Sequence, residues 1–339
     1  MKILFSSYTF FPNVGGIESV SEILSERFAE AGHEVHVITQ TRGEGDVEHQ
    51  TRYRLTRRPS LWKLFRLLCR CDILFQNNIS LRSLIPALLL RKPVVVVHQT
   101  WLRRHNGMIG WNNRLKQLLL SRATNVGISR AILDHIQSSS CVIGNPYDDE
   151  TFRMLSNISR DKTLVFLGRL VSDKGADLIL QALKLLYDED HLTPDLTVIG
   201  TGPEEYALQR LAAELGLDRQ VTFVGQKSGP ELAALLNRHH ILVVPSRWPE
   251  PFGIVALEGI ACGCVVVGSA DGGLKDVIGP CGVTFPNGDH RALAGQLKDL
   301  LLHQEKVAQL REECSSHLSK FRSDTVASAY LELIKKAVA

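Results

Sequence analysis

The stretch that decides the fold reads Glu250-Pro-Phe-Gly-Ile-Val-Ala-Leu-Glu258. It follows a strand-like run at 241–245, and its apolar second half continues as a predicted helix over 253–262. The first N–H groups of a helix have no partner within the helix and carry the positive end of its dipole. Gly253 lets a ligand approach the backbone closely. The stretch therefore predicts an anion site at a strand-to-helix loop.

The two glutamates lie on opposite sides of this predicted anion site. Glu258 follows Gly253 by about 7.5 Å along the helix at the usual rise per residue. At that distance a carboxylate is badly placed for a phosphate and well placed to accept from a sugar hydroxyl. We expect Glu250 to hold donor-sugar hydroxyls beside the backbone N–H groups of Phe252, Gly253 and Ile254. This layout predicts a sugar nucleotide as ligand; the alternative is that both glutamates are structural.

A second strand-to-helix loop carries two cations. It reads Phe166-Leu-Gly168-Arg169-Leu-Val-Ser-Asp-Lys174-Gly175 and ends a strand-like run at 163–167. Arg169 offers a planar fork to phosphate oxygens, and Lys174 offers a compact charge. Together they can neutralise a departing nucleoside diphosphate. The alternative is two surface cations near a helix start, where the dipole disfavours them.

These motifs resemble those of glycosyltransferase family 4, whose E-x7-E signature the first stretch matches. Pro245-Ser246 before it and Gly259-Ile-Ala-Cys-Gly263 after it extend the match. The resemblance implies the α/β GT-B architecture, two Rossmann-like doubly wound domains facing across a cleft. It implies retaining transfer of a hexosyl group from a UDP- or GDP-linked sugar. It also implies that Arg169 and Lys174 hold the diphosphate in place of a metal ion, so neither a metal nor a cofactor is expected.

The resemblance reaches the first half of the chain at two points. It places Gly15-Gly16, before the first long helix, against the diphosphate and the acceptor. It places His98, which ends a predicted strand, beside the transferred sugar. Gln99 stands where many family members carry aspartate, and this departure argues against a proton relay. The alternatives are a plain helix-start turn and a structural histidine.

Loops of the second half match the same family more closely. Gly200-Thr-Gly202-Pro-Glu-Glu205 lacks the third glycine of a dinucleotide-binding motif, and it resembles a ligand loop of the family's second domain at Gly202. Gln226 and Lys227 fall where the family contacts the nucleobase. Gly272-Gly273 continues the match. The resemblance therefore covers the second domain almost throughout.

Strand-like and helical patterns alternate twice along the chain, which predicts parallel sheets covered on both faces. The first half shows strands at 3–6, 35–39, 72–76, 94–98, 125–127 and 141–143, with helices at 19–31 and 81–90. The second half shows strands at 164–167, 196–200, 221–224, 242–245, 265–268 and 282–285, with helices at 176–187, 204–215, 231–239, 253–262 and 291–302. We expect an acceptor-binding domain over 1–150 and a nucleotide-sugar-binding domain over 160–321. The resemblance implies that 322–339 returns to the first domain.

Length and composition suit two globular domains. The chain has 339 residues, 44% of them hydrophobic, which is enough for two cores. Its seven cysteines follow no zinc-ligand spacing, so we expect reduced thiols in the cytoplasm. Residues 1–6 read as a strand rather than a signal sequence. Residues 252–270 read as a helix and a buried strand rather than a membrane span, because Glu258 lies within them.

Charge is uneven along the chain. Residues 1–150 hold 19 Lys and Arg against 13 Asp and Glu, whereas residues 151–339 hold 20 against 23. The segment 52–70 has seven cations, no acid and interleaved Leu, Trp and Phe. A helix over 61–70 would be basic on one side and apolar on the other, as in helices that rest on anionic bilayers. We expect peripheral attachment to the inner face of the cell membrane; the alternative is packing on the domain's own core. No motif for nucleic-acid binding accompanies the segment.

The sequence thus predicts a hexosyltransferase acting on a hydroxyl of a glycan, a glycolipid or a lipid-linked saccharide. Two other functions stay open: a non-hydrolysing nucleotide-sugar epimerase of the same architecture, and a non-catalytic sugar-nucleotide-binding subunit. The E-x7-E stretch and the cationic loop argue against the epimerase. The presence of every expected charged position argues against the non-catalytic subunit.

Overall fold

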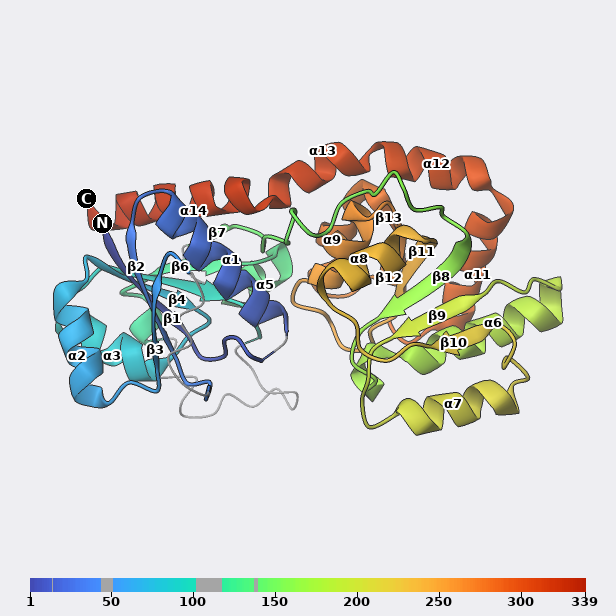
Figure 1. Cartoon of the computed structure of the whole chain (residues 1–339), viewed down its shortest axis with the longest axis horizontal. Coiled ribbons are helices and arrows are strands. Elements are labelled where there is room, and N and C mark those ends of the chain that lie inside the picture. Colours follow the sequence, from blue (N-terminus) through green and yellow to red (C-terminus); the bar gives the residue numbers. More distant parts are fainter. Residues whose placement is uncertain (14, 44–50, 102–117, 137–139) are drawn as a thin grey trace. The chain divides into compact units, whose positions relative to one another are not determined.

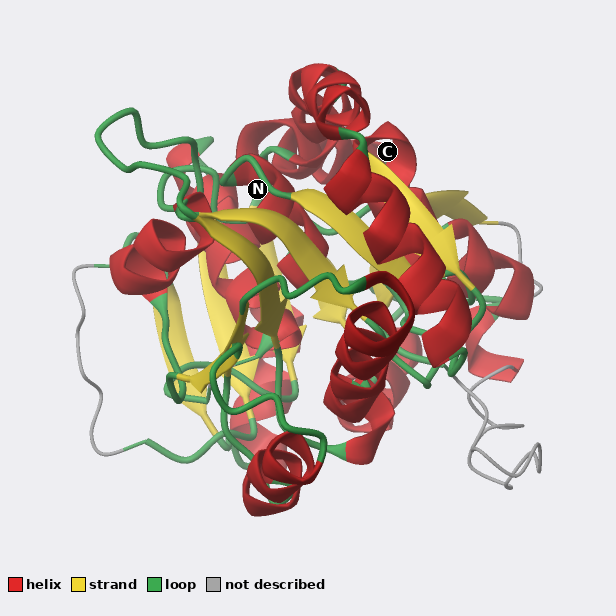
Figure 2. Cartoon of the chain, turned by 90° about the vertical axis from the view of Figure 1, so that its right-hand side faces the viewer, coloured by secondary structure: helices red, strands yellow, loops and turns green. Residues whose placement is uncertain are grey.

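The computed structural model describes residues 1–13, 15–43, 51–101, 118–136 and 140–339. Its contacts divide the chain into two compact units, residues 1–147 with 321–339, and residues 148–320. Each unit has its own sheet (Figure 1), and helices lie outside the strands (Figure 2). The chain passes from one unit to the other twice, because the first unit contains both ends of the sequence.

The first unit is built on a seven-stranded parallel sheet in the order β3-β2-β1-β4-β5-β6-β7. The strands are β1 (Lys2–Ser7), β2 (Glu34–Thr39), β3 (Arg54–Arg57), β4 (Ile73–Asn77), β5 (Val94–His98), β6 (Thr124–Gly127) and β7 (Ser140–Val142). Its described helices are α1 (Gly16–Glu30), α2 (Leu61–Arg70), α3 (Leu81–Leu89), α5 (Arg130–Ile136) and α14 (Ser323–Val338). Helical crossovers of this kind are what parallel neighbours require.

Side chains alternate between the two faces of this sheet, and each face carries its own apolar cluster. On the face covered by α1 and α14, the ring of Phe75 lies 5.0 Å from Phe5, 5.4 Å from Phe28 and 5.3 Å from Tyr330. Tyr330 comes from α14, so the far end of the sequence completes this cluster. The opposite cluster includes Leu4, Leu64, Leu68, Leu84 and Ala87, contributed by β1, α2 and α3.

The second unit repeats the topology with six parallel strands in the order β10-β9-β8-β11-β12-β13. The strands are β8 (Lys162–Leu167), β9 (Leu196–Ile199), β10 (Val221–Phe223), β11 (His239–Val244), β12 (Val265–Ser269) and β13 (Gly282–Phe285). The helices are α6 (Ala176–Asp190), α7 (Glu205–Glu214), α8 (Gly229–Asn237), α9 (Ile254–Ala261), α10 (Leu274–Ile278), α11 (His290–Leu302), α12 (Gln304–Glu312) and α13 (Cys314–Leu318), with a short 3-10 turn at Ser172–Lys174. An apolar cluster of this unit lies between the sheet and α6, α7 and α11.

Both sheets reverse their strand order at one point. The reversal lies between β1 and β4 in the first unit and between β8 and β11 in the second. Loops that leave the carboxyl ends of such neighbouring strands diverge to opposite sides of the sheet, and open doubly wound sheets bind ligands there. The topology therefore picks out one such switch point in each unit.

The predicted fold class is confirmed, because both sheets are parallel and carry helices on both faces. The predicted strands recur within a few residues, and α2 begins and ends as predicted. β3 was not predicted from the sequence, because its four residues start and end with arginine and show little apolar periodicity. No helix in the described part of the chain is both long and apolar enough to span a bilayer.

Candidate active site

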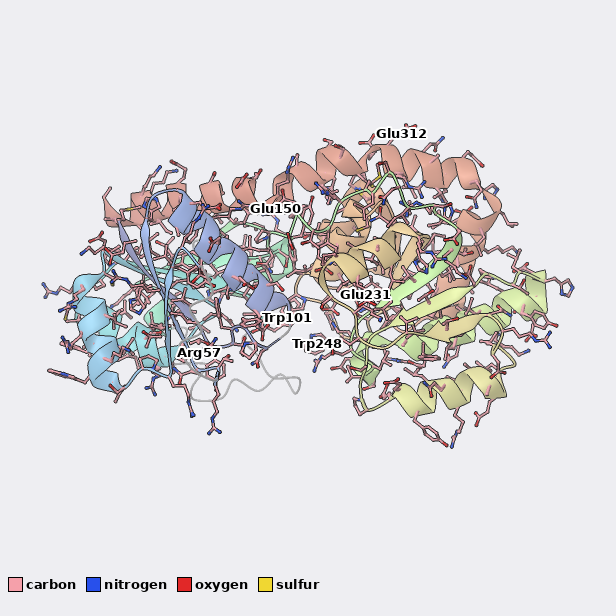
Figure 3. The ribbon with its side chains drawn as sticks, in the orientation of Figure 1. Arg57, Trp101, Glu150, Glu231, Trp248 and Glu312 are labelled. Atoms are coloured by element: carbon pink, nitrogen blue, oxygen red, sulfur yellow. The ribbon has the colours of Figure 1, made fainter. Side chains whose placement is uncertain are left out.

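The candidate site lies at the switch point of the second unit. β8 and β11 are neighbours, so the loops that leave them, 168–175 and 245–253, start side by side. Arg247 joins these loops: its backbone N–H donates to Asp173 O at 2.9 Å, and its guanidinium donates to both Asp177 oxygens at 2.5 and 2.6 Å. A bidentate pair fixes orientation as well as distance. Trp248, labelled in Figure 3, follows in the same loop.

Lys174 and Glu250, one from each loop, are in direct contact. Lys174 Nζ donates to Glu250 Oε1 at 2.5 Å, and Ser246 Oγ donates to the same oxygen at 2.7 Å. The Lys174 side chain is 32% exposed and that of Glu250 is 12% exposed. The structure therefore brings the predicted diphosphate-binding cation and the predicted sugar-binding acid together, with the cation reaching solvent.

The backbone of Glu250 is fixed by a third loop. Glu250 forms an isolated parallel bridge with Gly272, and its carbonyl accepts from the N–H of Gly273 at 2.7 Å. Asn287, beyond β13, donates from Nδ2 to Ser246 O at 3.0 Å. Loops that follow β11, β12 and β13 thus hold the carboxylate in place. Such support from surrounding hydrogen bonds is what a precise binding group needs.

α9 begins at Ile254, four residues after Glu250. Gly253 precedes it with a φ of +103°, and a Cβ there would lie 2.6 Å from Leu274 Cδ1, so glycine is required. The first turn contains no acid, so the positive end of the helix dipole is not compensated within the helix. Phe252 is buried and Ile254 is partly buried. The local geometry is that of an anion-binding helix start.

Glu258 lies in the second turn of α9 and is partly buried. Burial raises the pKa of its carboxyl to about 7, and the charge of Asp148 adds to the rise. Within the described part of the chain no donor reaches this carboxyl. Near neutral pH the carboxyl therefore exchanges between charged and neutral forms.

Arg169 lies in the same loop as Lys174 and is exposed. It forms no ion pair with any described residue. A Cβ added to Gly168 would lie 4.0 Å from Lys174 Cγ, which places Gly168 beside the lysine stem. A Cβ on Gly202 would lie 2.3 Å from Leu170 O, so Gly202 lets the loop after β9 pack on the loop after β8. Gly202 therefore has a packing role of its own.

Gln226 and Lys227 follow β10 at the edge of the sheet. Gln226 is exposed, and Lys227 Nζ lies 2.6 Å from Glu231 Oε1 one helical turn on. Glu231 is labelled in Figure 3. Surface pairs of this spacing contribute little to stability, so a ligand can replace this one at small cost.

The remaining predicted residues belong to the first unit. Gly15 precedes α1 and Gly16 is its first residue. His98 ends β5 and is fully buried, with its Nε2 3.0 Å from Asn125 Oδ1. The structure thus gives His98 a partner inside its own unit, and its role in aligning the sugar stays a prediction.

The switch point of the first unit is a network of neutral buried side chains. Asn77, at the end of β4, donates from Nδ2 to Ser21 Oγ at 2.7 Å, and Ser21 donates to Ser7 Oγ at 2.8 Å. Gln99 donates to Asn77 Oδ1 at 2.7 Å and exchanges two bonds with Asn145 at 2.7 and 2.8 Å. All five side chains are buried. Gln99 is therefore a structural member of this network.

Several supporting residues carry no clear signal in the sequence, and Ser246 stands out only as part of the Pro245-Ser246 motif. Arg247 and Asp177 are 70 positions apart, so their pairing depends on the strand order, which the sequence pattern does not give. Asn287 carries no local signal at all. Among the described residues, no three His, Cys, Asp or Glu side chains are grouped so as to hold a metal ion.

Two family models match most of the chain. The model described as Glycosyl transferases group 1 matches residues 148–316, and the model described as Glycosyltransferase Family 4 matches residues 14–150. D-inositol 3-phosphate glycosyltransferase of Corynebacterium jeikeium is 34% identical over 186 residues, covering 52% of this chain and 44% of that protein. The gpi3 subunit of phosphatidylinositol N-acetylglucosaminyltransferase of Schizosaccharomyces pombe is 26% identical, covering 90% of this chain and 74% of that protein. The chain thus spans less than half the length of the first of these relatives.

Solved structures share the fold of this chain. HepE of Anabaena in complex with UDP superposes with a TM-score of 0.85 at 19% identity, covering 99% of this chain and 100% of that one. Sucrose-phosphate synthase of Thermosynechococcus elongatus gives 0.80 at 21% identity, covering 99% and 98%. At these identities the likeness establishes the fold.

Proposed function

The chain belongs to glycosyltransferase family 4, and on that basis we propose that it transfers a hexosyl group from a nucleoside-diphosphate sugar to a hydroxyl of a glycan, a glycolipid or a lipid-linked saccharide. The second unit binds the donor and the first binds the acceptor. The donor nucleotide is UDP or GDP, and the UDP and UDP-glucose bound in HepE favour UDP. The reaction keeps the anomeric configuration and needs no metal ion. It takes place in the cytoplasm, at the inner face of the cell membrane.

The observation that carries this proposal is the contact between Lys174 and Glu250 at the switch point. Glu250 of this pair lies four residues before the start of α9, where backbone N–H groups and the helix dipole attract an anion. Arg169, exposed in the same loop as Lys174, adds a second cation. A diphosphate here meets two cations and a helix start, and its sugar meets a fixed carboxylate.

Donor binding exchanges the partners of Lys174. The diphosphate takes over the lysine charge, which is already in contact with solvent. Glu250 keeps its bond from Ser246 and its backbone contacts with Gly272 and Gly273, so it stays in place. Its freed lone pairs accept from sugar hydroxyls. One ion pair thus holds both groups in their working positions before the donor arrives.

The chemical step breaks the bond between the anomeric carbon and the β-phosphate oxygen and forms a bond from that carbon to the acceptor oxygen. The acceptor proton passes to the departing phosphate oxygen on the same face, which preserves the configuration. Arg169 and Lys174 stabilise the charge that develops on the diphosphate. No protein nucleophile takes part.

Product analysis tests the proposal. The protein is first screened for thermal stabilisation by UDP and by GDP, and then incubated with the matching α-linked sugar nucleotides and a panel of saccharide and glycolipid acceptors in the presence of EDTA. We expect stabilisation by one nucleotide and an α-linked product by NMR. A β-linked product would overturn retention, and loss of activity in EDTA would overturn metal independence.

The same experiment separates the two other functions. Conversion of the donor sugar without acceptor would identify an epimerase. Nucleotide binding with no donor consumption across the whole acceptor panel would identify a non-catalytic binding subunit. Absence of nucleotide binding would overturn the assignment of the site itself.

A further inference from the structure

The outer side of α2 in the first unit exposes more apolar surface than a core-packed helix needs. Leu64 and Leu68 are buried against the sheet, as expected for an amphipathic helix. Trp62, however, is 71% exposed, and Leu61 and Phe65 are exposed beside it. The apolar arc of α2 therefore continues well beyond the part that the core covers.

The exposed side chains form one surface across two helices. The rings of Trp62 and Phe65 are stacked, with centroids 6.2 Å apart and planes at 12°. α3 packs beside α2 through the shared apolar cluster (Figure 1) and exposes Ile85 and Leu89, the latter at 79%. We call the surface made of Leu61, Trp62, Phe65, Ile85 and Leu89 the α2–α3 face.

Unpaired cations border the α2–α3 face. Lys63, Arg66 and Arg70 are exposed on α2, and none forms an ion pair with a described residue. From Thr51 to Trp101 the sequence has ten Lys and Arg and a single acid, Asp72. A surface that combines bare aromatic rings with uncompensated positive charge is complementary to an anionic lipid surface.

Three other cations of the basic segment have partners within the unit. Arg52 pairs with Glu26 and Glu30, and Arg54 pairs with Glu34. Arg57, labelled in Figure 3, donates to Phe11 O at 2.7 Å. Of the seven cations predicted to form a basic surface over 52–70, the three of α2 and the exposed Arg58 have no ion pair with a described residue.

We propose that the α2–α3 face is a peripheral docking surface for an anionic bilayer. Its aromatic and aliphatic side chains enter the boundary between headgroups and acyl chains, a region where aromatic side chains such as Trp are favoured. Lys63, Arg66 and Arg70 contact the anionic headgroups. Lipid binding by this face goes beyond the transfer reaction, which needs only a hydroxyl acceptor, and it does not depend on that reaction.

The placement of the face explains what docking would do. α2 and α3 follow the parallel strands β3 and β4, so both helices start at the carboxyl edge of the sheet. Leu61 and Trp62 lie in the first turn of α2, on the same edge as the Gly15-Gly16 turn that follows β1. Docking therefore holds the ligand-binding edge of the first unit near lipid headgroups, where a lipid-borne acceptor is presented.

Vesicle binding tests the proposal. Full-length protein is sedimented with vesicles of phosphatidylcholine and with vesicles of an equimolar mixture of phosphatidylcholine and phosphatidylglycerol, at low and high salt. We expect binding to the anionic vesicles that weakens with salt. Each cation near an anionic surface strengthens partitioning about fivefold, so Lys63→Glu/Arg66→Glu/Arg70→Glu weakens it by at least about 100-fold. Trp62→Ser/Phe65→Ser weakens it at least about tenfold.

Matched variants of the second unit serve as controls. Arg210→Glu/Arg219→Glu/Arg291→Glu makes the same change in net charge, and Tyr206→Ser/Leu302→Ser removes two exposed large hydrophobic side chains. Both are expected to sediment like the wild type. Trp62→Phe keeps the anchor and removes only the fluorescence blue shift of Trp62 on vesicle binding. Nucleotide-induced thermal stabilisation should be the same in all variants, which separates loss of docking from loss of the donor site.

Three outcomes would overturn the proposal. One is equal sedimentation of the wild type and the α2 variants. A second is absence of vesicle binding by the wild type. The third is a wild-type dimer that the Trp62→Ser/Phe65→Ser variant abolishes without any lipid binding, which would assign the face to a second copy of the chain.

Discussion

The two switch points share a topology and differ in chemistry. In the second unit the switch point presents a charged pair, Lys174 and Glu250, of which the lysine reaches solvent. In the first unit the same position holds a network of amides and hydroxyls centred on Asn77, and all of its side chains are buried. One switch point can exchange partners with a ligand, and the other cannot do so without disrupting its interior.

The difference has a physical basis. An ion pair that water already reaches loses little when one partner is replaced by a phosphate oxygen. A buried amide network loses more, because each group left without a partner costs its full desolvation penalty. The strand order alone marks both positions as candidate sites. The side chains distinguish them: those of the second unit suit ligand binding, and those of the first unit hold its loops in place.

The largest expected effect is on turnover and comes from a substitution in the charged switch point. Lys174→Ala removes a cation that stabilises the departing diphosphate, and turnover at saturating donor should fall about 10²–10³-fold. Thermal stability should change little, because the lysine is partly exposed. Steady-state kinetics and calorimetry measure the two quantities. Lys184→Ala, which removes a partly exposed lysine of α6, is the control. Near-wild-type turnover of Lys174→Ala would contradict the assigned role.

The second prediction breaks the neutral switch point. Asn77→Leu deprives Ser21 and Gln99 of a partner and should lower the free energy of unfolding by about 1–3 kcal/mol. Nucleotide affinity should not change, because the donor site lies in the other unit. Denaturant unfolding and titration calorimetry test both statements, with exposed Asn13→Leu expected to stay within about 0.5 kcal/mol. If Asn77→Leu kept wild-type stability but lost nucleotide binding, the first switch point would be a binding site and not a structural network.

The smallest expected effect is a pH dependence of nucleotide affinity that depends on Glu258. The pKa of this carboxyl is raised to about 7 in the free protein, and a ligand hydroxyl that donates to the carboxylate favours the charged form. Nucleotide affinity should therefore increase severalfold from pH 6 to pH 8, with less than a tenfold change per pH unit. Glu258→Gln should remove this dependence, and exposed Glu305→Gln should keep it. A wild-type affinity that is flat with pH would show that no hydroxyl uses this group.

The same shift has a consequence for stability. The folded state binds the Glu258 proton more tightly than the unfolded state, in which the carboxyl has its ordinary pKa of 4.5. The contribution of this group to stability is therefore greatest below pH 4.5 and is lost as pH rises towards and through 7. Glu258→Gln should flatten that part of the stability profile, which thermal melts across this pH range can measure.

Most of the fold follows from local sequence patterns, and the exceptions have physical causes. Runs such as 94–97 and 265–267 consist only of valine, and strands buried on both faces read in this way. β3 does not, because it lies at the edge of the sheet and arginines occupy its ends. The bounds of α2 were predictable, but its exposed aromatic side chains were not, since the pattern fits a core-packed helix equally well.

The candidate site was predictable as a set of residue types and not as a set of contacts. The sequence indicates that Lys174 and Glu250 follow strands, and their direct contact depends on β8 and β11 being neighbours. The pairing of Arg247 with Asp177 depends on the same adjacency. Burial, which sets the pKa of Glu258 and encloses His98, arises only when distant segments pack together.

The return of α14 to the first unit affects the order in which the protein can fold during synthesis. Tyr330 of α14 is fully buried against Phe75, so the first sheet lacks part of its cover until the ribosome has translated all of residues 148–320. The second unit is continuous in sequence and can mature while the first is still waiting for its last helix. The first unit is thus synthesised first but completed last. Until α14 is made, the aromatic cluster around Phe75 stays partly uncovered, and we expect a chaperone to bind the nascent chain there.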